Sequence, residues 1–228
     1  MARKTLLLTA EDHDRVSAAV AAAEARTAGE IVTIVTGRSD GYSDIALAWA
    51  AFAAFTALVV LSLFPDFYLA LYDRLTGRWA ADWTPAAVLA FATGFAILKF
   101  LGTWLIQLWQ PLKFVLIPRR VKHARVRARA ETCFKVGAER RTHGRTGILI
   151  YLSLAERRAE IVADAAIASR VSAETWGAAM AAMLAEIREG RLADGMIAAT
   201  GQVGAVLAEH FPRAEDDVNE LPDRLIEV

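Results

Sequence analysis

Cysteine is almost absent from this sequence, and neither sign of charge is in excess. Cys133 is the single cysteine among 228 residues, so no disulfide can form within the chain. His123 and His143 lie near it in the sequence, but no second thiol accompanies them, and we expect no zinc site. Lysine plus arginine number 26, as do aspartate plus glutamate. Because the formal net charge is therefore zero, we expect no nucleic-acid partner.

The sequence also has few signatures of secretion or of chemistry. We expect no signal peptide, because the apolar stretch Leu6–Leu8 is short and acidic residues follow it at once. A P-loop and the H-E-x-x-H zinc motif are both missing. The fragment HGRTG, residues 143–147, is too short to cradle phosphate and is typical of a turn that ends a helix. Catalytic residues therefore stay unassigned.

Long apolar runs are what the sequence has in excess, and 55% of its residues are hydrophobic. The run Ala46–Phe64 has no charged residue and can span roughly 28 Å as a helix, close to the hydrocarbon thickness of a bilayer. A second run, Pro85–Trp109, begins with a residue suited to the first helical turn. We predict a transmembrane hairpin over residues 45–118, with helices at about 45–64 and 85–109. The alternative is a pair of buried helices in a soluble core.

The charges on either side of these runs predict how the hairpin is oriented. The connecting segment, predicted as a short loop over Asp66–Thr84, carries Arg74 and Arg78 offset by three aspartates. The segment after the second run is much more basic, with Lys113, Arg119, Arg120, Lys122, Arg125, Arg127 and Arg129. Because positive residues near membrane ends stay in the cytoplasm, we predict a multi-pass protein of the inner (plasma) membrane with both termini cytoplasmic. The same basic run could instead lie along anionic lipid headgroups.

One charged residue lies inside the second apolar run. Lys99, with Thr103 and Gln107 at helical spacing, forms a polar stripe on one face of the predicted helix. A charge near mid-bilayer costs on the order of 3 kcal/mol on insertion scales. The stripe could be a relay, an ion path or a polar helix contact, or Lys99 could extend its stem to the membrane interface. Since two helices enclose no pore, any transport would need several copies.

Helical and strand-like segments flank the hairpin on both sides. A helix capped by Thr9 and a β-branched strand, Glu30–Thr36, precede it. A basic helix, Val121–Arg141, and two strands, Ile148–Leu154 and Ala159–Val162, follow it. Two more helices are predicted, one with Ser172 as N-cap and Gly190 as stop, and one from near Asp194 to before Pro212. The predicted parts of the chain are residues 1–44, 45–118, 119–212 and a flexible acidic tail, 213–228.

Neither flank can bury its strands alone, which predicts one domain assembled from both. The strands Glu30–Thr36 and Ile148–Leu154 are near-continuous apolar runs, as expected where helices cover both faces of a sheet. We predict an α/β domain with a small mixed sheet of about three to four strands flanked by helices, interrupted by the transmembrane hairpin. The first two strands would be parallel, and Ile148–Leu154 would pair antiparallel with Ala159–Val162.

Polar residues gather where the predicted strands end. Asp40 and Asp44 follow the first strand, and Glu156 follows the second at the same edge of the sheet. Carboxylates there could bind a hard cation such as calcium, because ligands of open α/β sheets favour the carboxyl ends of strands. The alternative is ordinary turn chemistry. At the opposite edge, Glu30, Arg145 and Asp164 could form an ion-pair network.

The ordered set of segments resembles the TPM domain family. The pieces that carry the resemblance are TAGEIVTIVTG, RTGILIYLSLAERRAEIVAD and IREGRLADGMIAATGQVGAVLAEHF, within about Thr9–Phe211. The resemblance implies the α/β fold described above and links the chain to weak acid-phosphatase activity, to calcium or other metal binding, and to assembly or repair of membrane complexes. Asp164 stands where the family has a glycine-rich turn, which here reads DAAIAS, and so joins the candidate metal ligands.

Three functions from different classes follow from these observations. The one we favour is a membrane-anchored, non-catalytic interaction or assembly module, whose partners are the bilayer and either another membrane protein or a second copy. A metal-dependent phosphatase is the second, and it depends mainly on the resemblance. A small oligomeric transport or channel component is the third, and it depends on Lys99 and its stripe.

Overall fold

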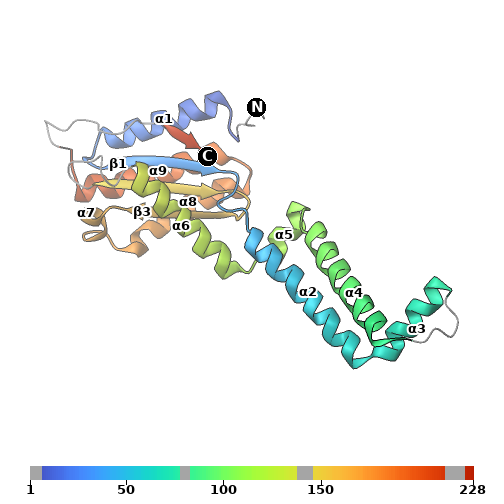
Figure 1. Cartoon of the computed structure of the whole chain (residues 1–228). Coiled ribbons are helices and arrows are strands. Elements are labelled where there is room, and N and C mark those ends of the chain that lie inside the picture. Colours follow the sequence, from blue (N-terminus) through green and yellow to red (C-terminus); the bar gives the residue numbers. More distant parts are fainter. Residues whose placement is uncertain (1–6, 78–82, 138–145, 214–223) are drawn as a thin grey trace. The chain divides into compact units, whose positions relative to one another are not determined.

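The computed structural model describes residues 7–77, 83–137, 146–213 and 224–228. The chain divides into two compact units (Figure 1). The first unit, here called the sheet unit, comprises residues 1–40 and 119–228. The second, the hairpin unit, comprises residues 41–118. The predicted boundary after residue 44 thus lies four residues earlier, at the end of the turn that follows the first strand.

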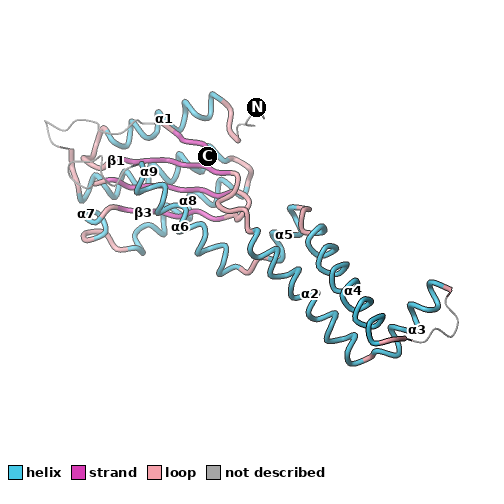
Figure 2. Tube along the Cα trace, viewed as in Figure 1, coloured by secondary structure: helices cyan, strands magenta, loops and turns pink. Residues whose placement is uncertain are grey.

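The sheet unit is built around a mixed sheet whose two central strands come from opposite sides of the hairpin (Figure 2). Its strands are β1 (Glu30–Thr36), β2 (Gly147–Ser153), β3 (Arg158–Ala163) and β4 (Leu225–Glu227), in the order β3-β2-β1-β4. β1 and β2 are parallel over their full length, with Glu30 opposite Gly147 and Thr36 opposite Ser153. β3 is antiparallel to β2. The predicted fold class and the pairing across the hairpin are confirmed.

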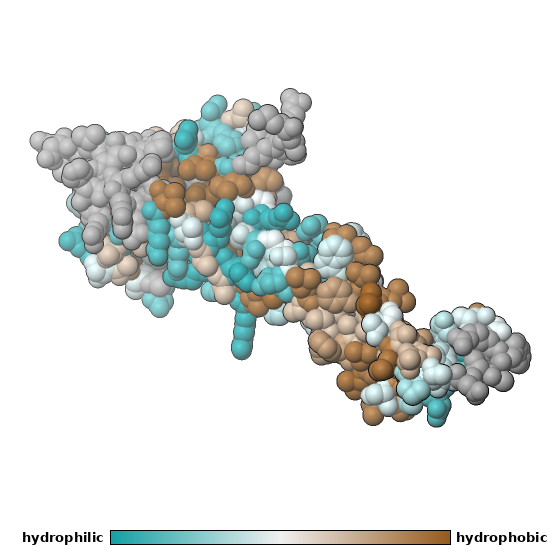
Figure 3. Space-filling view, viewed as in Figure 1, coloured by the Kyte–Doolittle hydropathy of each residue, from teal (hydrophilic) through white to brown (hydrophobic). Residues whose placement is uncertain are grey.

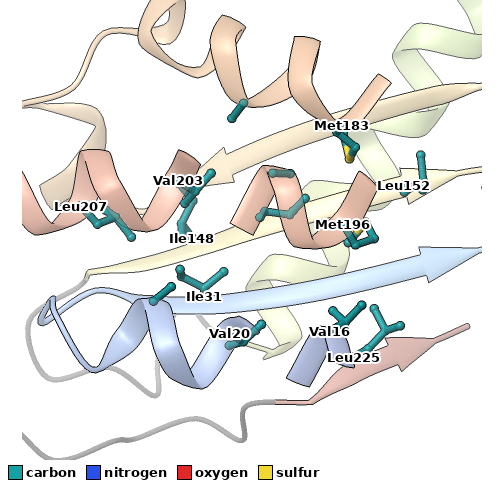
Figure 4. Close-up of a cluster of buried hydrophobic side chains, with 14 of the residues drawn as sticks. Val16, Val20, Ile31, Ile148, Leu152, Met183, Met196, Val203, Leu207 and Leu225 are labelled. Carbon is teal, nitrogen blue, oxygen red and sulfur yellow. The ribbon is translucent and has the colours of Figure 1, made fainter. Parts of the chain in front are cut away.

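Helices cover both faces of this sheet, and as a result every position of β2 and all but one position of β1 are buried. α6 (Arg119–Gly137) packs on one face, where Phe134 and Val126 join a core with Ile34, Leu149 and Tyr151. α1 (Ala10–Glu24), α8 (Trp176–Arg188) and α9 (Leu192–His210) pack on the other (Figure 4). The fully buried side chains of that second core include Val16, Val20, Ile148, Met183, Met196, Val203 and Leu207.

Local signals set the ends of these helices, with two differences from expectation. Thr9 and Asp12 form a capping box at the start of α1. Ser172 begins a 3-10 turn, Ala173–Thr175, and α8 itself starts later, at Trp176. α9 starts at Leu192, two residues before the predicted Asp194. A short helix not predicted, α7 (Ala165–Ala168), follows β3.

The end of the chain is ordered into the sheet, so the predicted flexible tail is wrong for its last residues. β4 pairs parallel with β1, and the Glu227 side chain is only 5% exposed. Its carboxylate accepts hydrogen bonds from the backbone N–H groups of Leu7 and Leu8, both at 3.0 Å, and lies 2.9 Å from His13 Nε2. A three-residue strand is too short to be recognised by its hydrophobic pattern. Glu227 therefore joins the two ends of the described chain to the edge of the sheet.

The hairpin unit contains two helices long and apolar enough to cross a membrane. These are α2 (Ser43–Leu63) and α4 (Pro85–Ile106), and most of their residues are not buried within the structure. Their exposed apolar surface, brown in Figure 3, argues against the alternative of buried soluble helices. The predicted loop Asp66–Thr84 is partly helical, because α3 (Pro65–Thr76) occupies its first half. A short α5 (Gln110–Leu116) follows α4.

The base of the hairpin is fastened by contacts within this unit. Tyr42 is fully buried and its ring packs edge-on against Phe114, with ring centroids 5.8 Å apart. Lys113 Nζ donates a hydrogen bond to the Gly41 carbonyl, and Trp49 Nε1 donates to Leu116 O at 3.2 Å. The two ends of the hairpin are therefore held together, as in a short connecting loop.

Close packing of α1 on α9 predicts a contrast between two glycines of α9. A Cβ at Gly204 would lie 2.6 Å from Ala23 Cβ, whereas a Cβ at Gly201 would meet nothing within 4 Å. Gly204→Ala should lower the free energy of unfolding of the sheet unit by about 1–3 kcal/mol through overpacking. Gly201→Ala should raise it by up to about 1 kcal/mol through helix propensity. Thermal unfolding of the full chain in detergent, followed by circular dichroism, measures both, and equal effects would contradict the packing described.

The Glu227 contacts predict a pH-dependent contribution to stability. Burial alone raises the pKa of this carboxyl, but the hydrogen bonds from Leu7, His13 and Leu8 outweigh burial and hold the pKa below its ordinary value. The carboxylate therefore stabilises the fold at neutral pH, and this stabilisation is lost as the pH falls through the lowered pKa. Glu227→Gln should cost about 1–3 kcal/mol at pH 7, and the difference from the unaltered chain should shrink in acid.

The exposed Glu209 provides the control for this pH dependence. Glu209→Gln should change stability by less than about 0.5 kcal/mol at either pH, as surface substitutions do. Glu227→Gln with the same deficit at pH 7 and at acid pH would contradict the role given to the carboxylate.

Candidate functional site

A group of hydrogen-bonded polar side chains lies at the carboxyl ends of β1 and β2. We call it the strand-end cluster, and it consists of Ser39, Tyr151, Ser153 and Glu156. Ser39 follows β1, whereas Tyr151 and Ser153 belong to β2. Ser39 Oγ donates to Ser153 Oγ at 2.9 Å and lies 3.1 Å from the Tyr151 hydroxyl. Ser153 Oγ in turn donates to Glu156 Oε2, and the Ser39 N–H donates to Glu156 Oε1 at 3.0 Å. The hydroxyls thus form a continuous chain that ends on a carboxylate.

This cluster fixes the turn by which the chain leaves the sheet for the hairpin. Glu156 is only 6% exposed, and its two oxygens accept hydrogen bonds from Ser39, which follows β1, and from Ser153 of β2. The Leu154 and Ala155 N–H groups also donate to the Thr36 and Gly37 carbonyls, at 3.1 and 3.0 Å. Removing the carboxylate would leave buried donors without acceptors. The cluster is therefore a structural fastening of the turn after β1.

Residues 37–41 read G-R-S-D-G and fit the G-x-S-x-G pattern of a nucleophile elbow, which the sequence reasoning passed over. In the structure, Tyr42 and Arg157 have a positive φ angle, whereas Ser39 does not. Its hydrogen-bond partners within the described chain are Ser153, Tyr151 and Glu156, and no histidine is among them. The arrangement therefore lacks the serine–histidine contact that activates such a nucleophile.

The phenol of Tyr151 and the thiol of Cys133 lie on the same face of the sheet and are kept neutral. Burial raises the pKa of the Tyr151 hydroxyl, and burial likewise raises the pKa of the Cys133 thiol. Both groups belong to, or pack against, the core formed with Phe134 of α6. Neither is poised to act as a base or a nucleophile at neutral pH. Sequence reasoning missed Tyr151, because it stands inside an otherwise apolar strand.

The basic residues of α6 partly neutralise carboxylates of the sheet unit. Arg125 Nε lies 3.3 Å from Asp40 Oδ2. Glu160 of β3 is approached by His123 at 3.5 Å and by Arg127 at 3.6 Å. Asp40, predicted as a metal ligand, is therefore engaged by a cation of the protein itself.

The four carboxylates predicted to bind a metal are not gathered in one place. Glu156 lies at the carboxyl end of β2. Asp164 follows β3 and lies beside the amino end of β2, where its N–H donates to Gly147 O at 2.9 Å. Asp44 is in the first turn of α2, in the hairpin unit. Over the residues described, no three His, Cys, Asp or Glu side chains are grouped as metal ligands. These four carboxylates therefore do not fit a single divalent-cation site.

Asp164 has a local role in the fold. Its Oδ1 accepts a hydrogen bond from the Ala165 N–H at 2.6 Å and caps α7. Its Oδ2 is buried and has no hydrogen-bond partner in the part of the chain that the structure describes. The expected network with Glu30 and Arg145 involves a residue, Arg145, that lies outside the described ranges.

Gln107 and Lys99, two residues of the polar stripe in the hairpin unit, have different environments. Gln107 is buried, and its Nε2 donates to the carbonyls of Ala46 and Thr103, both at 3.1 Å, so it joins α4 to α2. Lys99 is exposed, with its Nζ 5.2 Å from the centroid of the Phe95 ring. A cation–π contact of this kind recovers about 0.5–2 kcal/mol, which is less than the roughly 3 kcal/mol that a mid-bilayer lysine costs. If α4 crosses a membrane, the contacts of Lys99 within the described residues would therefore offset only part of this cost.

Residues 112–206 match the family model described as TPM domain. This stretch contains α6, β2, β3, α8 and most of α9. It includes the segment RTGILIYLSLAERRAEIVAD and all but the last five residues of IREGRLADGMIAATGQVGAVLAEHF, two of the segments that carry the sequence resemblance. No sequence among curated proteins matches.

One solved structure with a similar fold is the NMR structure of BA42 protein from the psychrophilic bacterium Bizionia argentinensis sp. nov.. It is 18% identical in sequence, with a TM-score of 0.57 and coverage of 100% of each chain. At this identity the likeness concerns the fold alone. Residues 112–206 thus match the TPM domain family, and the mixed four-stranded sheet flanked by helices is the fold for which the likeness to the solved structure stands.

Proposed function

We propose that this protein is a membrane-anchored TPM domain that acts as an interaction or assembly module for membrane proteins. The observation that carries the proposal is the position of the hairpin, which is inserted between β1 and α6 of one folded domain. The domain therefore has two covalent links to the apolar helices, one on each side of the insertion. A single flexible tether would leave the domain much freer to turn.

Two links suit a module that docks on neighbours in the same membrane. Restricting the motion of the domain lowers the entropy lost on binding and raises its effective concentration near membrane partners. The fastened hairpin base supports this reading, because Tyr42–Phe114 and Lys113–Gly41 contacts hold the two links close together. An enzyme acting on soluble substrates would gain little from the same arrangement.

The strand-end cluster also supports a non-catalytic role. Ser153 is fully buried and Tyr151 is 1% exposed, and their hydroxyls are engaged within the cluster. A nucleophile needs a free lone pair directed at an accessible reacting atom. The oxygens of these residues serve the fold instead.

The membrane orientation is part of the proposal. α2 and α4 would cross the inner (plasma) membrane, and the basic residues Arg119, Arg120 and Lys122 at the start of α6 would remain in the cytoplasm. Both halves of the sheet unit would then lie on the cytoplasmic side, as one folded domain requires.

Fusion reporters test this orientation. A cytoplasm-active reporter after Val228 should be active, and the same reporter inserted at Thr76, between α2 and α4, should be inactive. A reporter active only outside the cytoplasm should give the inverse pattern. Equal activity at the two positions would contradict the spanning hairpin.

Purification in mild detergent tests the interaction role. The full chain should emerge in a stoichiometric complex with another integral membrane protein or with further copies of itself, as identified by cross-linking and mass spectrometry. The same preparation should release no phosphate from a generic phosphate ester, with or without added divalent ions. Release that Ser39→Ala or Asp164→Ala abolishes would replace the proposal with the phosphatase alternative.

A further inference from the structure

The hairpin unit has a groove along its long helices. The groove has a volume of about 1330 Å³ and is lined by residues of α2, α3 and α4. Small side chains recur on both of its long walls, with Ala53 and Ala57 on α2 and Ala90 and Gly94 on α4. Spacing of four places each pair one helical turn apart, which is the pattern that lets transmembrane helices approach closely. Lys99 is the charged residue among those lining this apolar groove.

The position of the Lys99 ammonium argues against a lysine that reaches out to the membrane interface. α4 has 22 residues and is about 33 Å long, and Lys99 stands about 10 Å from its nearer end, at Ile106. The ammonium lies over the ring of Phe95, one turn back toward the middle of the helix. Helical side chains incline toward the helix N-terminus, so this direction is the ordinary one. The charge therefore lies close to mid-span.

No carboxylate within the described chain pairs with this ammonium. α4 contains no acidic residue, and the single acidic residue of α2, Asp44, is in its first turn. The other residues that line the groove are apolar or aromatic, apart from Thr56 of α2 and Thr103 of α4, and neither threonine carries a charge. A cation at this depth favours an anionic partner more strongly than one in water, because the surroundings screen the attraction poorly.

We propose that the groove binds a transmembrane helix of a different membrane protein, and that this helix brings an aspartate or glutamate to Lys99. A second copy is a poor occupant, because two parallel copies facing each other would bring two ammonium groups to the same depth. A lipid headgroup is a poor occupant as well, because its phosphate lies at the interface and not at mid-span. The inference rests on the proposed interaction function and names the chemistry of the partner.

Two phenylalanines of α2 allow a matched cross-linking experiment. Phe52 lines the groove and Phe55 does not, yet they are 62% and 68% exposed. The hydrogen bond from Gln107 to Ala46 sets the antiparallel alignment, so both residues lie within a turn of the depth of Lys99. Each is replaced in turn by the photoreactive p-benzoylphenylalanine in the full chain, and native membranes are irradiated.

The probe at Phe52 should attach to one integral membrane protein, within a membrane span that contains an aspartate or glutamate. The probe at Phe55 should not. Lys99→Leu should lower the yield at Phe52 about tenfold, the loss expected from one helix–helix ion pair, and Lys99→Arg should preserve it. Lys99→Leu makes α4 more apolar, so failed membrane insertion cannot explain a loss. Lys99→Asp combined with lysine in place of the partner's carboxylate should restore the yield.

Other results separate this inference from the broader function. Equal yields from Lys99→Leu and the unaltered chain would overturn the inference, as would attachment at Phe52 only to lipid or only to a second copy. If those results accompany a stoichiometric complex with a membrane protein in mild detergent, the interaction function survives without this groove. If no such complex forms either, the proposed function fails as well.

Discussion

The parallel pairing of β1 with β2 is the contact on which the rest of this structure depends. Seven residue pairs, from Glu30–Gly147 to Thr36–Ser153, join segments that the hairpin separates in the sequence. Until they meet, the backbone donors and acceptors on the facing sides of β1 and β2 are unpaired, and the cores on the two faces of the sheet are each incomplete. Folding of the domain must therefore wait until the hairpin and α6 have both followed β1.

The hairpin inserted between β1 and α6 is compatible with folding of the sheet unit, because its two ends lie as close together as those of a short loop. In an ordinary βαβ unit, a helix such as α6 carries the chain from one parallel strand to the next. Here the hairpin enters that crossover at the turn after β1, and its own contacts bring residues 41–42 and 113–114 together. Closing a long flexible loop would cost conformational entropy, but a loop whose ends are already joined costs little more than a turn. The strand-end cluster then fixes where the chain leaves the sheet, through Glu156 and Ser39.

Much of this architecture could be predicted from the sequence because it depends on long, regular patterns. The β-branched run of β1, the apolar run of β2 and the two long apolar helices each extend over enough residues to indicate their type. β4 could not be found, since three residues carry no periodicity and its place depends on the edge that β1 leaves open. The candidate metal site was predicted less accurately than the fold, for a related reason. Carboxylates at strand ends look alike in sequence, and only the antiparallel direction of β3 separates Asp164 from Glu156.

Several buried polar residues of this chain are stabilised by hydrogen bonds from the surrounding fold. Lys99 differs, because no carboxylate of the described chain pairs with it. Glu156, Glu227 and Gln107 are all largely buried, and each accepts or donates several hydrogen bonds. Their neighbours thus offset the cost of removing them from water. Lys99 sits in an apolar groove with an aromatic ring and no carboxylate of the described chain. A carboxylate supplied by another protein would offset the cost of placing Lys99 in a membrane, because an ion pair is stronger in the poorly screening interior of a bilayer than in water.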